Sequence, residues 1–235
     1  LVGDDTPSGK LVDTFAKSLE DYPSSYNFHE SNAYAEYTDD VYVGYRYFET
    51  VPGKKDAVVY PFGYGLSYTT FDIKTVSANA ADGKIYFTVN VKNTGAVAGK
   101  EVVQIYYGAP QGVLGKAKKE LGAFLKTKLL EAGEEQTLIL TIDIADMASY
   151  DDLGKIKKAC YILEAGEYKF YVGNNVADAA EIDYKYVLVE NVITQELTTR
   201  MSPTSLSKRL LANGEYEEIE RTIPVTLPFT TPRYK

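Results

Sequence analysis

IYFTVNVKNTG, residues 85–95, is the clearest sign of the fold in this chain. Its apolar residues Ile85, Phe87, Val89 and Val91 alternate with Tyr86, Thr88 and Asn90. Successive side chains of a strand point to opposite faces of a sheet, so this alternation predicts a strand with one face in a core. Asn93-Thr94-Gly95 then predicts a turn, because these residue types favour tight turns.

Similar short runs follow, separated by further turn signals. We predict strands at 101–107, 121–125, 138–142, 168–172 and 182–189, with turns at 131–134 and 164–167. About seven short strands in about 120 residues are typical of a β-sandwich of the immunoglobulin or fibronectin type III kind. With one Cys and no Trp, the chain lacks the Cys–Trp–Cys pattern of antibody domains. The sequence therefore predicts a mainly β fold, with the sandwich at 72–190.

The flanking parts differ in composition and read as long irregular extensions. Residues 1–71 are rich in Tyr, Ser, Asp and Gly, and so long a loop-rich stretch predicts a segment that wraps onto other material. Residues 191–235 are polar and contain Pro224, Pro228 and Pro232, which predict an extended linker. Within this tail, Leu206 to Leu211 predicts a short helix that begins after Ser205 and ends at Asn213-Gly214.

Residues 41–71 combine many aromatic residues with Gly44, Gly63 and Gly65. Glycine permits close approach of backbones, and aromatic side chains bury large areas against defined partners. We therefore expect a docking surface between large parts of a protein rather than a catalytic loop. The candidate interdomain interface residues are Tyr42, Tyr45, Arg46, Tyr47, Phe62 and Tyr64, with Arg46 paired to a carboxylate or to backbone carbonyls.

Composition excludes several classes of function. A net charge of −8 argues against nucleic acid or an anionic membrane as a partner. No apolar run approaches the roughly 20 residues of a membrane span, and the first residues lack a signal-peptide pattern. Cys160 lies in an apolar run, which predicts a buried, inert thiol, and His29 is the only histidine. We expect no metal site, no cofactor and a bacterial cytoplasmic location, with secretion as the alternative.

The carboxylates do not form a convincing catalytic pair. Glycoside hydrolysis needs two carboxyl groups about 5–10 Å apart across the scissile bond. The acidic pairs are adjacent in sequence, where extended neighbours point to opposite faces. These pairs are Asp4-Asp5, Asp39-Asp40, Glu134-Glu135, Asp151-Asp152 and Glu217-Glu218. Ser8 lacks a nucleophile elbow and Gly63-Tyr64-Gly65 lacks a phosphate-binding pattern, so we predict no catalytic residue in this chain.

Several ordered motifs resemble glycoside hydrolase family 3, the β-glucosidases and their relatives. GDDTPSGKL at 3–11 resembles the end of that family's α/β sandwich domain, and YTDDVYVGYRYF at 37–48 resembles the linking segment. YPFGYGLSYTTF at 60–71 is similar to the entry into the fibronectin type III-like domain. Motifs within that domain follow in order at 91–95, 99–104, 121–124 and 166–168.

The resemblance implies a retaining enzyme that cleaves β-linked glucose through a covalent glycosyl-enzyme intermediate. Its catalytic residues belong to a β/α barrel and to an upstream part of the α/β sandwich domain. The implied partners are therefore these remaining domains of the same enzyme, which bind most of the β-glucoside substrate. The length after residue 190 suits a permuted domain order, in which residues 193–235 lead towards the barrel.

Two functions remain open from the sequence. In the first, residues 1–71 and the sandwich brace the catalytic domains of a β-glucosidase without contributing to the chemistry. In the second, the chain is an independent carbohydrate-binding module that uses some of its 21 tyrosines as sugar platforms. Tyrosine is also enriched at protein interfaces, and the order of the motifs favours the first function. Assembly into a homo-oligomer stays open as well.

Overall fold

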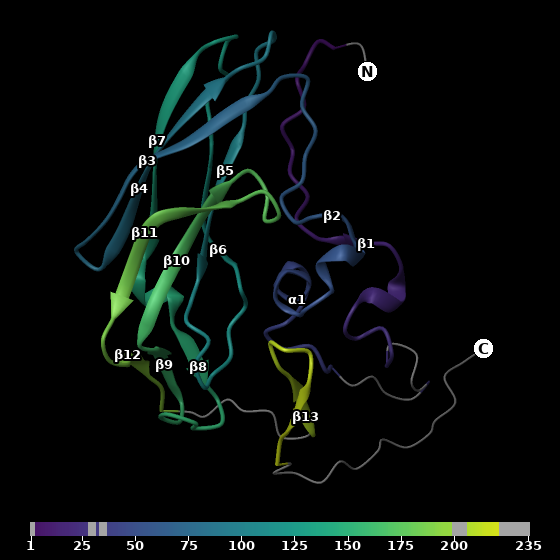
Figure 1. Ribbon diagram of the computed structural model, residues 1–235, viewed down its shortest axis with the longest axis vertical. Coiled ribbons are helices and arrows are strands. Elements are labelled where there is room, and N and C mark those ends of the chain that lie inside the picture. Colours follow the sequence, from purple (N-terminus) through teal and green to yellow (C-terminus); the bar gives the residue numbers. More distant parts are fainter. Residues whose placement is uncertain (1–2, 28–31, 33–36, 199–205, 221–235) are drawn as a thin grey trace.

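The computed structural model describes residues 3–27, 32, 37–198 and 206–220, and its main body is a two-layered β-sandwich (Figure 1). One sheet has three antiparallel strands in the order β3 (Phe71–Ala81), β4 (Lys84–Asn93) and β7 (Glu135–Asp143). The other has four, in the order β11 (Ala180–Leu188), β10 (Gly166–Gly173), β5 (Val102–Gly108) and β6 (Glu120–Lys126). The mainly β sandwich predicted from the sequence is confirmed.

The alternating stretch that predicted the fold forms the centre of the core. Ile85, Phe87, Val89 and Val91 on β4 are all fully buried between the two sheets. Phe87 meets Phe170 of β10 across the sandwich, with ring centroids 5.2 Å apart. Burying a side chain of this size contributes about 1.5–3 kcal/mol, so the inner face of β4 accounts for much of the core's stability.

A tight hairpin turn joins β3 to β4. Asp82 and Gly83 have φ of +50° and +75°, the left-handed pair that a two-residue type I′ turn requires. The twist of this turn matches that of the flanking strands, so it fixes the long register from Phe71 opposite Asn93 to Ala81 opposite Lys84. Asp-Gly is a strong hairpin signal in a sequence, and here it marks β3, which the alternation analysis did not predict.

A smaller sheet closes one end of the sandwich. It consists of β12 (Val192–Glu196), β9 (Cys160–Leu163) and β8 (Ser149–Asp151), preceded by the 3₁₀ turn η3 (Ile144–Met147). Cys160 is fully buried in β9, as the sequence predicted. Strand β12 pairs with β9, so the chain continues to hydrogen-bond with the sandwich beyond residue 190.

Asp151, at the end of β8, organises the loop that follows it. Its carboxylate accepts four backbone N–H groups, from Gly154, Lys155, Ile156 and Lys157, at 2.7–2.9 Å. Burial alone would raise the pKa of Asp151, but these four donors together hold the pKa below its ordinary value. The carboxylate is therefore committed to the loop and is not available for chemistry.

The residues before the sandwich contain little regular structure. They form β1 (Phe15–Ala16), the 3₁₀ turn η1 (Leu19–Asp21), α1 (Tyr45–Thr50), the 3₁₀ turn η2 (Lys55–Ala57) and β2 (Val58–Tyr60). We call the described residues before β3 the N-terminal segment; Figure 1 shows it running alongside the sandwich. Strands β1 and β2 pair only with each other. In the part of the chain that the structure describes, no helix is long and apolar enough to cross a membrane.

The helix predicted at Leu206 to Leu211 is wrong. Residues Lys208–Leu210 form β13, which pairs antiparallel with β14 (Tyr216–Glu218). Asn213-Gly214 turns this C-terminal hairpin instead of ending a helix: Gly214 has φ +88° and the Asn213 side chain accepts the Glu215 N–H at 2.9 Å. Asn-Gly suits both roles, and packing against the N-terminal segment decides between them. Ser205 and the prolines at 224, 228 and 232 lie outside the described residues.

Candidate interdomain interface

The outer face of the four-stranded sheet is apolar where the N-terminal segment crosses it. Tyr106 of β5, Leu121 of β6 and Tyr171 of β10 lie side by side in the strand register and point away from the core. Their neighbours Ile105 and Tyr107 point inward, into the core. A strand that is apolar on both faces must be covered on both. Strand β5 therefore requires a second layer outside the sheet, and the N-terminal segment supplies it.

Tyr45 of α1 and Phe62 form that second layer. Their rings pack 4.6 Å apart, and Tyr45 meets the ring of Tyr106 edge-on at 6.1 Å. The Tyr45 hydroxyl accepts the Leu121 N–H at 3.0 Å. Tyr106 is fully buried and its hydroxyl donates to Gln104 Oε1, and burial raises the pKa of this phenol well above its ordinary value. The contact combines apolar burial with satisfied polar groups, as stable interfaces require.

Two glycines allow backbones to meet at this contact. Gly63 has φ +82°, and a Cβ there would lie 2.6 Å from Gln104 Oε1 and 2.9 Å from Asn175 Cα. A Cβ on Gly65 would overlap the carbonyl of Gly9. Leu11 joins the same crossing by accepting the Gly63 N–H and donating to Tyr64 O, both at 2.8 Å. The glycines among the aromatic residues therefore mark crossing points of the chain.

Two polar contacts fix the N-terminal segment to the edge of the sandwich. Lys10 forms an ion pair with Glu101 at 2.7 Å, and both side chains are largely buried. Asn93 is fully buried; its Oδ1 accepts from the Thr69 hydroxyl at 2.6 Å, and its amide donates to Val97 O and Leu130 O. The motifs at 3–11, 60–71 and 93–101, which are far apart in the sequence, therefore meet in space.

A second apolar cluster lies around helix α1 in the N-terminal segment. Tyr42, Tyr47, Phe48 and Val51 are buried together, and Leu210 of the C-terminal hairpin packs against them. The Tyr42 hydroxyl donates to the carbonyl of Lys116, which lies in the loop between β5 and β6. This cluster therefore joins three parts of the chain: the N-terminal segment, the hairpin and the sandwich.

Arg46 and Tyr64 complete the set of predicted interface residues. Arg46 Nε lies 3.7 Å from Glu120 Oε2, and the guanidinium lies over the Tyr45 ring at 5.9 Å, so the expected carboxylate partner is present. Tyr64 packs against Tyr60 at 5.1 Å and contacts neither cluster. Five of the six predicted residues thus lie where the N-terminal segment meets the rest of the chain. Their role between domains of a larger protein stays a prediction.

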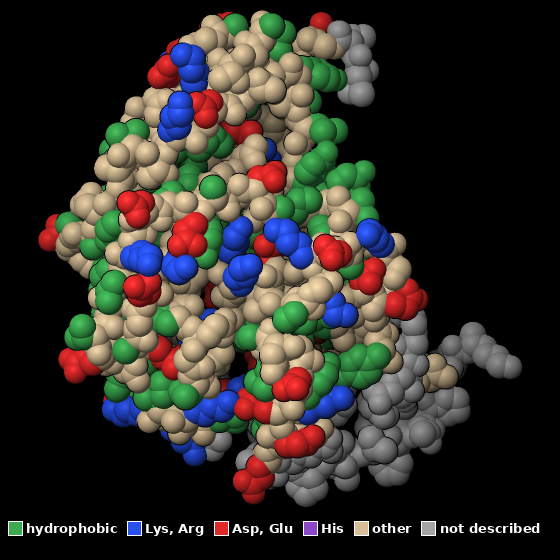
Figure 2. All heavy atoms as spheres, viewed as in Figure 1, with side chains coloured by type: hydrophobic (Ala, Val, Ile, Leu, Met, Phe, Trp, Pro, Cys, Tyr) green, Lys and Arg blue, Asp and Glu red, His purple; other side chains and the backbone are tan. Residues whose placement is uncertain are grey.

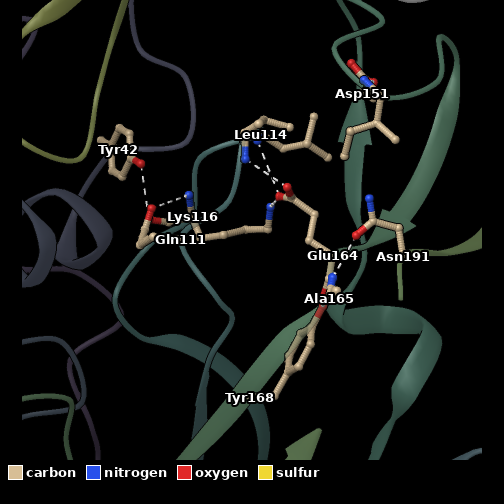
Figure 3. A network of polar contacts seen from close by, with 11 residues as sticks. Tyr42, Gln111, Leu114, Lys116, Asp151, Glu164, Ala165, Tyr168 and Asn191 are labelled. Atoms are coloured by element: carbon tan, nitrogen blue, oxygen red, sulfur yellow. Dashed lines mark hydrogen bonds and ion pairs between the residues drawn. The ribbon is translucent and has the colours of Figure 1, made fainter. Parts of the chain in front are cut away.

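The loop between β5 and β6, residues 109–119, is held rigid by a buried ion pair (Figure 3). Lys116 and Glu164 are 2 % and 6 % exposed and bond to each other directly. Glu164 also accepts the N–H groups of Val113 at 2.8 Å and Leu114 at 3.3 Å. A Cβ on Gly112 would overlap the Glu164 carboxylate. The loop that receives the Tyr42 hydroxyl is therefore shaped by one carboxylate at the end of β9.

Arg209 of the C-terminal hairpin connects the same three parts through charge. Its two terminal nitrogens bond to the two carboxylate oxygens of Asp152 at 3.2 and 2.5 Å. Its Nε lies 2.6 Å from Asp40 Oδ2. The Arg209 side chain is only 14 % exposed. A planar guanidinium has donors along two edges, so it can bond to two carboxylates at once. Because Asp40 and Asp152 lie far apart in the sequence, Arg209 ties both to the hairpin.

Burial of Tyr42 predicts a loss of stability at high pH. Burial raises the pKa of Tyr42 to about 12, against about 10 in the unfolded chain. Because the folded chain holds the Tyr42 proton more tightly, ionisation of Tyr42 does not affect the free energy of unfolding below about pH 10. Between about pH 10 and 12 the unfolded chain ionises first, and the free energy of unfolding falls. We expect Tyr42→Phe to lose the hydrogen bond to Lys116, costing about 1 kcal/mol at neutral pH, and to weaken the alkaline decline. Urea unfolding across that pH range measures both effects, and an unchanged decline would contradict the assignment to Tyr42.

Several residues of the interface were not predicted from the sequence. The outward-facing Tyr106 had a readable signal, since VVQIYYG at 102–108 is apolar at adjacent positions rather than alternate ones. Lys116, Glu164 and Arg209 had none, because their partners lie 48 or more residues away in the sequence. Such pairs become visible only when the chain is folded.

Six of the ten carboxylates in the adjacent acidic pairs, for which the sequence predicted no catalytic role, make contacts within the chain. Asp40 and Asp152 bind Arg209, and Asp151 binds its loop. Glu134, Glu135 and Glu217 each pair with a lysine. Among the described residues there is also no group of three His, Cys, Asp or Glu side chains that could hold a metal ion.

Comparison with known families and proteins agrees with this geometry. A family model for the fibronectin type III-like domain matches residues 101–176, which lie within the sandwich. β-Glucosidase A of Butyrivibrio fibrisolvens is 53% identical over 240 residues, covering 96% of this chain and 29% of the relative. The β-glucosidase of Ruminococcus albus is 44% identical over 223 residues, covering 94% of this chain and 23% of the relative.

Solved structures show the same arrangement. A β-glucosidase from Paenibacillus barengoltzii superposes with a TM-score of 0.85 at 45% identity, covering 96% of this chain and 26% of that one. The GH3 β-glucosidase of Bifidobacterium adolescentis superposes with a TM-score of 0.68 at 33% identity, covering 80% and 27%. The chain thus spans less than a third of the length of these relatives.

Proposed function

Because this chain is a portion of a glycoside hydrolase family 3 protein and includes a fibronectin type III-like domain, we propose that it is the non-catalytic part of a retaining β-glucosidase. In this proposal the N-terminal segment and the sandwich brace the catalytic domains, which bind the β-glucoside. The whole protein would hydrolyse terminal β-linked glucosyl residues. The domain division at residues 71 and 190, and a permuted order in which residues 193–235 lead to the barrel, belong to the same proposal.

One observation carries the bracing role: the N-terminal segment is apolar on two sides. One side is buried against the sandwich through Tyr45 and Phe62. The other exposes Val12 (88%), Phe15 (51%) and Leu19 (59%) to solvent. Figure 2 shows hydrophobic side chains along the edge of the molecule where this segment runs. An exposed apolar surface of this kind marks a contact with other protein, and the remaining domains are the nearest partner.

The alternative function, sugar platforms formed by tyrosines, loses support from burial. Tyr42, Tyr47 and Tyr106 are 5%, 6% and 0% exposed, so their rings cannot stack on a polysaccharide. The aromatic residues of 41–71 mostly contact protein. A bacterial cytoplasmic location also belongs to the proposal, and cell fractionation tests it.

The activity is tested with an aryl β-glucoside. We expect the whole protein to hydrolyse it and to release β-glucose first, because a double displacement retains configuration. The 235-residue chain alone is expected to show no hydrolysis. Proton NMR of the first product identifies the anomer. Release of α-glucose by the whole protein, or turnover by the chain alone, would contradict the proposal.

The bracing role is tested in the whole protein with Phe15→Ser. If Phe15 is covered by another domain, the substitution removes buried apolar area and is expected to cost about 1–3 kcal/mol. It should lower the melting temperature and the activity at elevated temperature. Val189→Ser is the matched control, because Val189 is 94% exposed at the far end of β11. In the 235-residue chain alone Val189→Ser should be neutral and Phe15→Ser should lose only the edge-on contact with Tyr60, so an equally large effect of Phe15→Ser there would refute the interdomain contact.

A further inference from the structure

A cavity of about 840 Å³ lies between the N-terminal segment, the sandwich and the C-terminal hairpin. Its walls come from residues 40–46, the loop at 111–115, strand β8 and residues 209–213. In Figure 2 a recess is visible between the lower part of the sandwich and the hairpin. Small-molecule sites measure about 300–1,000 Å³ and lie preferentially where separate parts of a fold meet. The cavity therefore has the size and the place of a ligand site.

The charged groups on the cavity wall are paired with one another, with one carboxylate in excess. Three cations and four carboxylates line it: Arg46, Lys155 and Arg209, with Asp40, Glu120, Asp152 and Glu217. Arg209 is paired with Asp40 and Asp152, and Lys155 with Glu217 at 2.7 Å. Arg46 pairs with Glu120 at 3.7 Å, so every cation on the wall is compensated and none is left to attract an anionic ligand. It offers fixed donors and acceptors to a neutral molecule that carries both kinds of group.

Two further features select the chemistry of that molecule. Arg46 Nε is itself shielded from solvent and makes no hydrogen bond among the described residues, although the 40% exposed side chain forms a long ion pair with Glu120 at 3.7 Å. A buried donor without a partner costs free energy, so a ligand hydroxyl that accepts from it would be favoured. Tyr150 also lines the cavity, and its ring is braced by Tyr161 of β9 at 5.2 Å. An aromatic ring offers a flat surface to the C–H face of a pyranose.

We propose that this cavity binds a neutral mono- or disaccharide, with Tyr150 against the sugar ring and Arg46 Nε donating to one of its hydroxyls. The wall is preorganised, because Glu164 fixes the backbone at 113–114 and Arg209 fixes the hairpin. The inference does not depend on the hydrolytic activity of the whole protein.

The test uses the 235-residue chain, in which no catalytic domain competes for the sugar. Saturation-transfer NMR and calorimetry with glucose and cellobiose are expected to show binding with a Kd on the order of 1 mM. Inorganic phosphate, as the anionic probe, is expected not to bind. No sugar binding at concentrations well above this Kd, or binding of phosphate in place of sugar, would overturn the proposal.

Two substitutions locate the site. Tyr150→Leu removes the aromatic face and is expected to weaken sugar binding at least about tenfold. Val113→Trp places a large ring at the rim, where Val113 is 57% exposed, and should also weaken binding while leaving the wall's polar groups in place. Val189→Trp, at a site 94% exposed and away from the cavity, is the control. Thermal unfolding confirms that each variant is folded, and if Tyr150→Leu does not fold, Val113→Trp decides alone. Unchanged sugar binding in a folded cavity variant places the sugar elsewhere and refutes the proposal.

Discussion

Replacing Lys116 with methionine is expected to lower the free energy of unfolding by about 3–5 kcal/mol, because it leaves a buried carboxylate without its cation. Glu164 is 6% exposed and its oxygens point towards the Lys116 ammonium and the N–H groups of Val113 and Leu114. Two backbone donors remain in the variant, but they do not neutralise the charge. Methionine has nearly the length of lysine, so the lost stability reflects the missing charge rather than a change in side-chain volume. Urea unfolding at neutral pH measures it.

Two controls separate this pair from ordinary surface ion pairs. Lys185 and Glu167 form an exposed ion pair at 2.7 Å, with side chains 42% and 53% exposed. Lys185→Met should therefore lower the free energy of unfolding by less than about 1 kcal/mol. The double variant Lys116→Met, Glu164→Leu removes both charges and should recover a substantial part of the loss. It should not recover all of it, because Leu cannot accept the two loop N–H groups. Equal losses for the single and double variants would show that packing, not the unpaired charge, sets the cost.

The Lys116 variant also links the sandwich to the interface. Lys116 supplies the carbonyl that accepts the Tyr42 hydroxyl, and its loop forms one wall of the cavity. If Glu164 is what holds this loop, hydrogen exchange in residues 41–50 should speed up together with exchange in the loop. Exchange that speeds up in the loop alone would show that the N-terminal segment does not depend on it.

The sequence was sufficient for the sandwich because its information is local. The alternation of Ile85, Phe87, Val89 and Val91 determines which face of β4 enters the core, whatever surrounds it. The turn signal at 131–134 lies between β6 and β7, and the signal at 164–167 covers the connection from β9 and the first two residues of β10. The aromatic and glycine content of 41–71 likewise indicated a packing surface, since that combination suits close contact between backbones and rings.

The interface partners could not be predicted because they depend on contacts between distant residues. Nothing near Lys116 in the sequence indicates Glu164, and nothing near Arg209 indicates Asp40. The C-terminal hairpin shows the same limit: Leu206 to Leu211 satisfies local rules for a helix, yet Leu210 gains more by packing on the Tyr42 cluster as part of a strand. Local propensity is a weak guide wherever a short segment is held mainly by other parts of the fold.

Arg209→Met is expected to release the C-terminal hairpin and to cost about 2–4 kcal/mol. The substitution leaves Asp40 and Asp152 close together without the cation between them, so two carboxylates repel each other in a partly buried site. Both acids retain some contact with water, at 34% and 17% exposure, so the expected cost is lower than that of a fully buried pair. Strands β13 and β14 share only a short register of three residue pairs, and a two-stranded ribbon of this size is not stable by itself.

The hairpin is therefore attached mainly through Arg209 and Leu210, together with the more exposed Lys155–Glu217 pair. Hydrogen exchange should show faster exchange at 208–218 and at 39–42 in Arg209→Met, with the strands of the sandwich unchanged. Arg209→Lys keeps the charge but cannot bond to both carboxylates in the same planar geometry, so it should fall between the parent and Met. Lys157→Met, which removes a cation from an exposed pair with Glu196, is the control and should leave the hairpin protected.

If Arg209→Lys behaves as the parent does, net charge alone holds the hairpin and the geometry of the guanidinium is irrelevant. If Arg209→Met leaves exchange at 208–218 unchanged, apolar packing of Leu210 is the attachment, and Leu210→Ala becomes the variant that releases it.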